Sequence, residues 1–326
     1  MLTRRRACLA IAFAVAAPGS SLAQPPKIWR LGLLSPDGTF GDTSTLLAAF
    51  RQGLAERGWI EGRNVTLVRR DSAGEGAFFL GNALLALGVD LIVAASTLGA
   101  RVARDATSTV PIVFVGVSDP VASGLVARLA PPRGTNLTGF IDVDVRSSAR
   151  ALALLKQAAP AATRVALLAD PRAPLAAEYT TEVETTARVL GVTVHRRPVR
   201  EAGELAAAFA AIVREYDQAL VVLPHPVFST LRKPLVTFAA RQRLPAVYAY
   251  RAFAADGGFM TYGTDVADLY RRAAGVVDRI LKGAAPGDLP IERPTKFYFV
   301  INFRAARGLR VTITEALRAQ ADQVIE

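Results

Sequence analysis

The regular alternation of apolar runs with helix-like segments is the feature that most constrains the fold of this chain. Between residues 29 and 120, runs such as DLIVAAST (90–97) and PIVFVGVSDP (111–120) alternate with segments whose apolar residues recur every three or four positions. Short continuous runs rich in Val, Ile and Leu predict strands of a parallel sheet that helices cover on both faces. This part of the chain is therefore expected to form a doubly wound α/β layer.

The same alternation begins again after NLTGFIDVD and predicts a second α/β unit. The C-terminal residues are too few for a third layer, so we expect them to add elements to both units. The chain would then cross between the units three times, near 140–146, 259–264 and 292–297. These crossings define lobe 1, residues 28–142 plus 264–293, and lobe 2, residues 143–263 plus 294–326. A three-strand hinge of this kind suits opening and closing around a ligand.

The first residues, MLTRRRACLAIAFAVAAPGSSLAQ, have the pattern of a secretory signal peptide. Three arginines precede an apolar run, and Ser21-Leu22-Ala23 provides the small residues of a cleavage site, so we predict a signal peptide over 1–23. The adjacent arginines permit twin-arginine export as well as the general route. Cys8 is the only cysteine and lies in this segment, so the mature chain has no thiol nucleophile and no disulfide. A periplasmic protein follows.

The distribution of charge and the absence of catalytic motifs exclude several classes of protein. The net charge is +11, but the arginines are scattered rather than clustered, which argues against a nucleic-acid partner. The chain has no Gly-x-Ser-x-Gly or phosphate-loop motif, and no cluster of His, Cys and carboxylates at metal-ligand spacing. His195 is expected on the surface of a strand. We therefore predict no catalytic residues, no metal and no cofactor.

Polar residues follow several of the expected strands, where ligands bind in open parallel sheets. These residues are Ser35, Ser96, Thr97, Ser118, Asp119, Asp142, His225 and Tyr250. Ser, Thr and Asp are also the preferred caps of helices, so capping and ligand binding both remain open for each loop. The aspartates Asp119, Asp142 and Asp170 could converge, which leaves a periplasmic α/β enzyme as an alternative.

Three long segments resemble one known family. FRQGLAERGWIEGRNV (50–65), PIVFVGVSDPVASGLVARLAPPRGTNLTGF (111–140) and residues 257–302 together resemble the ABC-transporter substrate-binding proteins that include tryptophan- and tyrosine-type binding proteins. The resemblance implies a type I periplasmic-binding-protein fold, a monomer that closes on its ligand, and delivery to an inner-membrane ABC permease. A ligand-sensing module for a membrane receptor is the alternative. The ligand contacts that the family resemblance implies are Ser35, Ser96, Thr97, Gly116, Ser118, Asp119, Asp142, His225, Tyr250 and Asp265.

One loop departs from the family pattern. Amino-acid-binding members resemble one another in an Asp-bearing loop where this chain has Pro224-His225-Pro226. A carboxylate there would pair with an ammonium group, whereas a histidine is neutral or positive near pH 7. The ligand expected is therefore a small carboxylate-bearing or amino-acid-like molecule.

The stretch from Gly116 to Pro120 is interpreted as a binding loop. Gly116 would let the backbone approach the ligand and Ser118 would donate a hydrogen bond. Pro120 would begin a helix at its favoured first position, and Asp119 would either cap that helix or contact the ligand.

Overall fold

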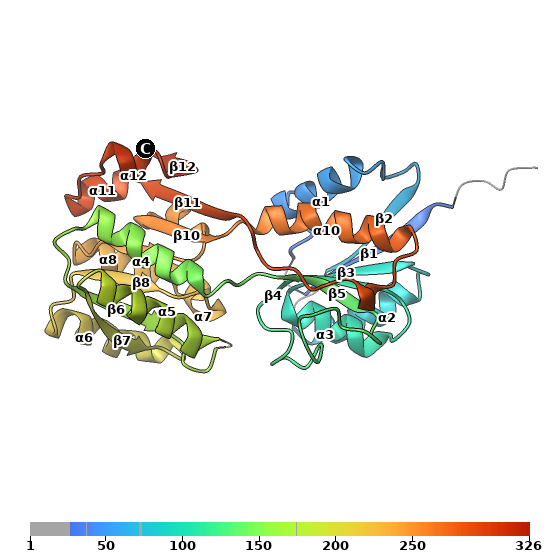
Figure 1. The fold of residues 1–326 in the computed structure, drawn as a ribbon, viewed down its shortest axis with the longest axis horizontal. Helices are drawn as coiled ribbons and strands as arrows, with labels where there is room; N and C mark the ends of the chain where they lie inside the picture. Colours follow the sequence, from blue (N-terminus) through green and yellow to red (C-terminus); the bar gives the residue numbers. More distant parts are fainter. Residues whose placement is uncertain (1–26, 37, 72–73, 174) are drawn as a thin grey trace, which may run out of the picture.

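The computed structural model describes residues 27–326 except 37, 72–73 and 174. The predicted signal peptide, 1–23, lies outside the described residues. Two α/β lobes lie side by side along the long axis of the molecule and are joined by three extended segments (Figure 1). In the part of the chain that is described, no helix combines the length and apolar character needed to span a bilayer.

Lobe 1 contains a five-stranded parallel sheet with strand order β2-β1-β3-β4-β5. Its strands are β1 (Trp29–Ser35), β2 (Val65–Asp71), β3 (Leu91–Ala95), β4 (Ile112–Val117) and β5 (Leu137–Ile141). Its helices are α1 (Thr45–Ala55), α2 (Leu80–Leu85), α3 (Ser96–Ala106) and α10 (Val266–Leu281), with 3₁₀ turns η1 (Gly74–Phe79) and η3 (Pro286–Asp288).

Lobe 2 contains a seven-stranded sheet with strand order β12-β11-β10-β9-β8-β6-β7. Its strands are β6 (Arg164–Ala169), β7 (Thr193–Pro198), β8 (Ala219–Val222), β9 (Ala246–Tyr248), β10 (Met260–Thr264), β11 (Phe297–Asn302) and β12 (Gln323–Ile325). Its longer helices are α4 (Arg146–Ala158), α5 (Ala176–Val189), α6 (Leu205–Arg214) and α8 (Arg232–Arg241). The short ones are η2 (Ala202–Glu204), α7 (Pro226–Thr230), α9 (Ala252–Ala255), α11 (Phe303–Leu309) and α12 (Glu315–Arg318).

Both sheets are covered on both faces, which explains why their central strands, such as β3 and β8, are continuously apolar. All five residues of β3 are fully buried, with α1 and α10 on one face of the sheet and α2 and α3 on the other. Helix α10 packs so closely on α1 that a Cβ atom at Gly53 would lie 2.3 Å from the carbonyl oxygen of Arg271. This contact fastens a C-terminal helix to the N-terminal lobe.

The lobe 2 sheet is not entirely parallel, contrary to expectation. Strand β11 pairs antiparallel with β10, while the other strand pairs of this sheet are parallel. The reason is the path of the chain, because β10 leads out of lobe 2 into α10 on lobe 1. The chain that returns must enter lobe 2 in the opposite direction, and it does so as β11 (Figure 1).

Hydrogen bonds hold the three connecting segments together between the lobes. The Thr264 hydroxyl donates to the backbone oxygen of Asp142 at 2.6 Å, and the Asp265 amide donates to the Lys296 oxygen at 3.0 Å. The Ile141 amide donates to the Glu292 oxygen at 3.0 Å. The connections are therefore a bonded hinge rather than three independent linkers.

Candidate functional site

The carboxyl ends of the parallel strands of both lobes point toward the space between them. Strand β5 ends where the chain leaves lobe 1, so the strands parallel to β5 also run toward lobe 2. Strand β10 ends where the chain leaves lobe 2, so the strands parallel to β10 run toward lobe 1. The loops that follow β1, β3 and β4 therefore face those that follow β6, β8 and β9. This is the edge at which ligands bind in open α/β sheets.

Asp142 occupies the centre of this arrangement, directly after β5 on the first connecting segment. Its Oδ1 atom is buried and has no hydrogen-bond partner among the residues that the structure describes. Burial raises the pKa of Asp142, and a hydrogen bond with the Ser118 side chain partly offsets that rise. A buried carboxylate oxygen without a donor is costly unless a ligand supplies one.

Two tyrosines of lobe 2 lie within electrostatic reach of this carboxylate. Burial raises the pKa of both Tyr250 and Tyr179, and the negative charge of Asp142 adds to each rise. Both phenols therefore remain protonated and provide a donor beside an aromatic surface. Tyr179 was missed in the sequence because it lies within α5, where an aromatic residue at helical spacing indicates core.

The loops after β1 and β3 bring Ser35, Ser96 and Thr97 to the same edge. Ser35 is fully buried, and its Oγ accepts from the Thr39 amide at 2.6 Å, so it shapes its own turn. Ser96 begins α3 with φ of +65°, a left-handed conformation that is unusual for a residue other than glycine. Thr97 follows it, and both are half-buried. The N-cap residue of α3, Ala95, has no polar side chain with which to cap the helix, and the first amides of a helix are donors that suit an anion.

The loop after β4 combines a bulge with a tight turn. Gly116 has φ of +78°, and the pairing of β4 with β5 shifts register beside it, between Val115 and Val117. Asp119 Oδ1 accepts from the Val121 and Ala122 amides at 3.0 and 2.9 Å, so this side chain stabilises its own loop. These are hydrogen bonds of a turn and not of a helix cap, because residues 120–124 form turns.

The prediction that a helix begins at Pro120 is wrong. Residues 120–124 form turns, in which the Leu125 amide donates to the Pro120 oxygen at 2.9 Å. Gly124 adopts φ of +71° within these turns. A left-handed residue this soon after the start ends helical propagation, because the next amide no longer points along the helix axis.

His225 is the N-cap of α7 and lies next to a carboxylate. Its Nδ1 accepts from the Val227 amide at 3.4 Å and is 3.7 Å from Asp170 Oδ2. Burial lowers the pKa of His225, and the nearby Asp170 partly opposes this. Arg172 binds both oxygens of Asp170, at 3.1 and 2.9 Å, and lowers the pKa of that carboxyl. The histidine loop is therefore neutral near pH 7, beside an aspartate that already has a cation.

Asp265 has partners within the hinge. Its Oδ1 accepts from the Asp268 amide at 3.2 Å as the cap of α10, and its Oδ2 pairs with Lys296 Nζ at 3.1 Å. These contacts give it a role in positioning α10 and the third connecting segment. Asp119, Asp170 and Asp265 are thus not among the residues with a buried unpartnered oxygen in the described structure, whereas Asp142 is, through its Oδ1.

Two small cavities lie at this edge of lobe 2. One is lined by residues that include Asp170, Tyr179 and Pro224, and the other by residues that include Ser147 and Tyr262. Each has a volume of about 10 Å³, roughly the room a single water requires. Neither of these two cavities has room for a solute, so a solute site at this edge requires the opposite lobe.

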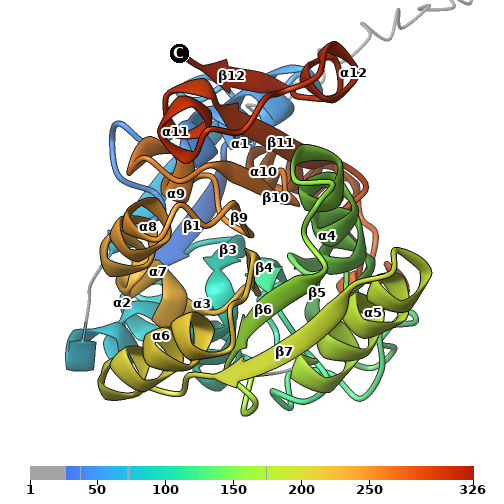
Figure 2. The same ribbon diagram turned by 90° about the vertical axis from the view of Figure 1, so that its left-hand side faces the viewer.

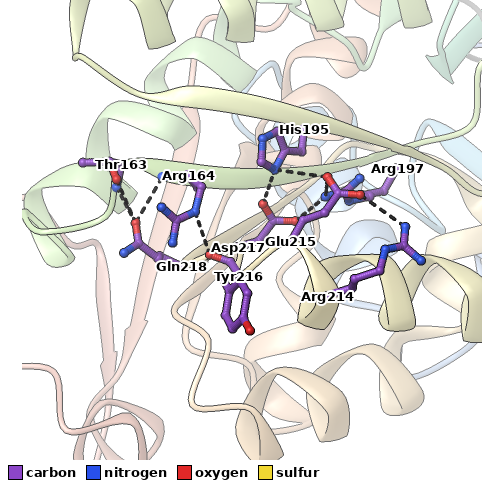
Figure 3. Close-up of polar contacts among 9 residues, drawn as sticks. All are labelled: Thr163, Arg164, His195, Arg197, Arg214, Glu215, Tyr216, Asp217 and Gln218. Carbon is purple, nitrogen blue, oxygen red and sulfur yellow. Dashed lines mark hydrogen bonds and ion pairs between the residues drawn. The ribbon is translucent and has the colours of Figure 1, made fainter.

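A second buried aspartate lies at the other end of lobe 2 with a full set of partners (Figure 3). Asp217 accepts from His195 Nδ1 at 2.5 Å and from Arg197 Nη2 at 2.8 Å, and Glu215 also pairs with Arg197 at 2.8 Å. His195, which was expected on the surface, is half-buried on the edge strand β7. Only 24% of its side chain is exposed, because it faces the buried carboxylate.

Comparisons with known proteins agree with this architecture. A curated relative, the tyrosine-binding protein of Clostridioides difficile (strain R20291), is 25% identical over 221 residues, which cover 68% of this chain and 63% of the relative. The match thus spans less than two thirds of that relative's length. An ABC domain from Streptococcus pneumonia in complex with L-Trp has a TM-score of 0.76 and 24% identity, covering 92% of this chain and 100% of that one.

A third similar structure is a ligand-free, open substrate-binding protein with adhesive properties from Clostridium difficile. It has a TM-score of 0.75 and 22% identity, covering 92% of this chain and 99% of that one. The expected type I periplasmic-binding-protein fold is confirmed, since more distant solute-binding proteins share it. The family model for ABC transporter substrate binding proteins matches residues 44–325. This chain therefore belongs to the ABC transporter substrate-binding protein family.

Proposed function

We propose that this chain is the periplasmic, monomeric solute-binding component of an ABC importer. It captures an amino-acid-like ligand between its two lobes, carries out no chemistry on it, and delivers it to an inner-membrane permease. The observation that carries the proposal is the buried Oδ1 of Asp142 at the hinge, which has no hydrogen-bond partner in the part of the chain that the structure describes. A ligand that brings an N–H donor to this atom stabilises the closed protein, which is what couples binding to closure.

The groups around Asp142 favour an ammonium group on the ligand. Among the acidic side chains of the proposed contacts, and within the described part of the chain, Asp142 pairs with no cation and its Oδ1 has no hydrogen-bond partner. Asp265 pairs with Lys296, and Asp119 accepts from backbone amides. The uncapped start of α3, with Ser96 and Thr97, provides amide donors for a ligand carboxylate. A ligand with both groups would span from the lobe 1 helix to the hinge.

The tyrosines favour an apolar or aromatic side chain on that ligand. Tyr250 and Tyr179 present rings as well as hydroxyl groups near Asp142. Aromatic surfaces bind aromatic groups through offset or edge-to-face packing. The curated relative is a tyrosine-binding protein, and a structure of the same fold contains L-Trp. We therefore propose that Ser35, Ser96, Thr97, Gly116, Ser118, Asp142, His225 and Tyr250 line the ligand site, with Asp119 and Asp265 supporting it.

Calorimetry with L-tyrosine and L-tryptophan tests the proposal, with tryptamine and indole-3-propionate as analogues that lack one charged group. We expect saturable binding of one of the amino acids, and weaker binding of the analogue without the amine. Equal binding of the amine-free analogue would assign Asp142 another role. Mass spectrometry of the recovered ligand must show it unchanged, because a converted product would indicate the enzyme alternative.

A further inference from the structure

A cavity of about 240 Å³ lies at the end of lobe 2 that is remote from lobe 1. It is lined by α8, α11 and the segments that precede β9 and β10. Figure 2, which views the molecule from this end, shows α8, α9 and α11 next to one another. Apart from Tyr248, the last residue of β9, the lining residues lie away from the strand ends that form the proposed solute site. The cavity is therefore separate from that site.

The walls of this cavity are largely apolar. Val236 and Ala239 of α8 line one side, and Ala305 and Leu309 of α11 line the other. Asn302 also borders it, but its side chain is already used, since Oδ1 accepts from the Ala305 amide and Nδ2 donates to the Ala254 oxygen. The walls thus fit the apolar body of a small molecule, and its polar contacts must come from other residues.

Tyr248 provides a buried donor at this cavity. The residue is 1% exposed, and its hydroxyl has no hydrogen-bond partner within the described part of the chain. Its Cε2 lies 3.0 Å from where a Cβ at Gly258 would be, and Gly258 also lines the cavity. Tyr248 is itself a lining residue, and Cε2 adjoins the carbon that carries its hydroxyl. Buried hydroxyl groups in proteins almost always have a partner.

Arg304 provides a positive charge where the cavity meets solvent. This arginine is exposed and lines the cavity, and its Nη2 donates to the Glu326 oxygen at 3.3 Å. A guanidinium has five N–H donors, so others remain for an anion. The residues that line the cavity include no Asp or Glu. Its charge therefore complements an anionic group rather than a cationic one.

We propose that this cavity is a second binding site, for a small aromatic carboxylate that also carries a hydroxyl or carbonyl oxygen. The carboxylate lies at Arg304, the ring lies between α8 and α11, and the oxygen accepts a hydrogen bond from Tyr248. Burial raises the pKa of Tyr248, so this hydroxyl remains a donor at neutral pH. The site does not depend on which solute binds between the lobes.

Saturation-transfer NMR titrations of the mature protein with 4-hydroxybenzoate and with benzoate test this site. We expect 4-hydroxybenzoate to bind about 10-fold more tightly than benzoate, because only it has an acceptor for Tyr248. In Tyr248→Phe the two probes should bind equally. A preference that persists in Tyr248→Phe, or no saturable binding up to about 10 mM, overturns the proposal.

Gly308 offers a variant that fills the cavity without disturbing the fold. A Cβ at this position meets no atom within 4 Å, and the residue lines the cavity. Gly308→Leu should abolish binding of 4-hydroxybenzoate, whereas the smaller Gly308→Ala should retain it. Asp142→Asn, in the separate solute site, should leave this binding unchanged. Binding that survives Gly308→Leu but is lost in Asp142→Asn would place the probe between the lobes and refute the second site.

Discussion

Asp142 and Asp217 are both buried aspartates, yet their surroundings differ. Asp217 has a cationic guanidinium and an imidazole on its two oxygens (Figure 3). Asp142 interacts with the Ser118 hydroxyl and a backbone amide but with no cation, and its Oδ1 has no donor in the described structure. A saturated buried carboxylate stabilises a fold, while an unsaturated one weakens the free protein and is suited to bind a ligand. The difference separates an architectural site from a functional one.

Removing the guanidinium that pairs with Asp217 should produce the largest effect, a loss of stability. Arg197→Met leaves Asp217 buried with only the histidine as partner, which should lower the free energy of unfolding by about 3–5 kcal/mol. Chemical denaturation measures this change. The exposed Arg214 pairs with Glu215 at 3.3 Å, so Arg214→Met is the matched control and should have little effect. Loss of ligand affinity in folded Arg197→Met would show that the two aspartates do not have separate roles.

Removing the charge of the unsaturated site should affect binding and not stability. Asp142→Asn should weaken binding of an amino-acid ligand about 10- to 100-fold, because a hydrogen bond to a charged group is lost. The free protein should be at least as stable as the wild type, since a poorly solvated charge is removed. Calorimetry and thermal unfolding of the same samples measure both quantities. A large loss of stability would make Asp142 a structural residue like Asp217.

The backbone at Gly116, in the loop near Asp142, should tolerate substitution poorly. Gly116→Ala places a Cβ on a residue with φ of +78°, which should cost about 1–2 kcal/mol of stability. Gly308, in α11, meets no neighbour, so Gly308→Ala should be neutral or stabilising as a control. Unchanged stability of Gly116→Ala would mean that this loop adapts freely.

The pH dependence of binding should be the smallest and most specific difference. Because burial raises the pKa of Asp142 above its ordinary value, the carboxylate is fully charged only above that raised pKa. Affinity for an ammonium-bearing ligand should therefore decrease as the pH falls from neutral through it. Ser118→Ala removes the group that opposes the rise, so the decrease should begin at higher pH.

Two variants separate the groups that titrate near the ligand. Asp142→Asn should show a flat affinity profile over the same pH range. His225→Gln removes a residue whose lowered pKa makes it gain a positive charge only on acidification. A profile that is unchanged in Asp142→Asn and lost in His225→Gln would assign the pH dependence to the histidine.

Most of the architecture could be predicted because it depends on local apolar patterns. The alternation of buried strands and amphipathic helices predicted two α/β lobes, and the surplus of C-terminal elements predicted that the chain crosses between them. The helix after Pro120 was wrong because the conformation of Gly124 is decided by its loop. The reversed direction of β11 was also missed, since strand direction depends on where α10 packs.

The sequence by itself determined the α/β class, the loops that carry polar residues and the family resemblance. It could not separate Asp142 from Asp217, since both are aspartates next to apolar segments. Only the tertiary structure decided that His195 and Arg197 reach one of them from a distant strand and that Tyr179 approaches the other from a helix. Whether a buried charge has a partner depends on residues far apart in the chain, and no local pattern records that.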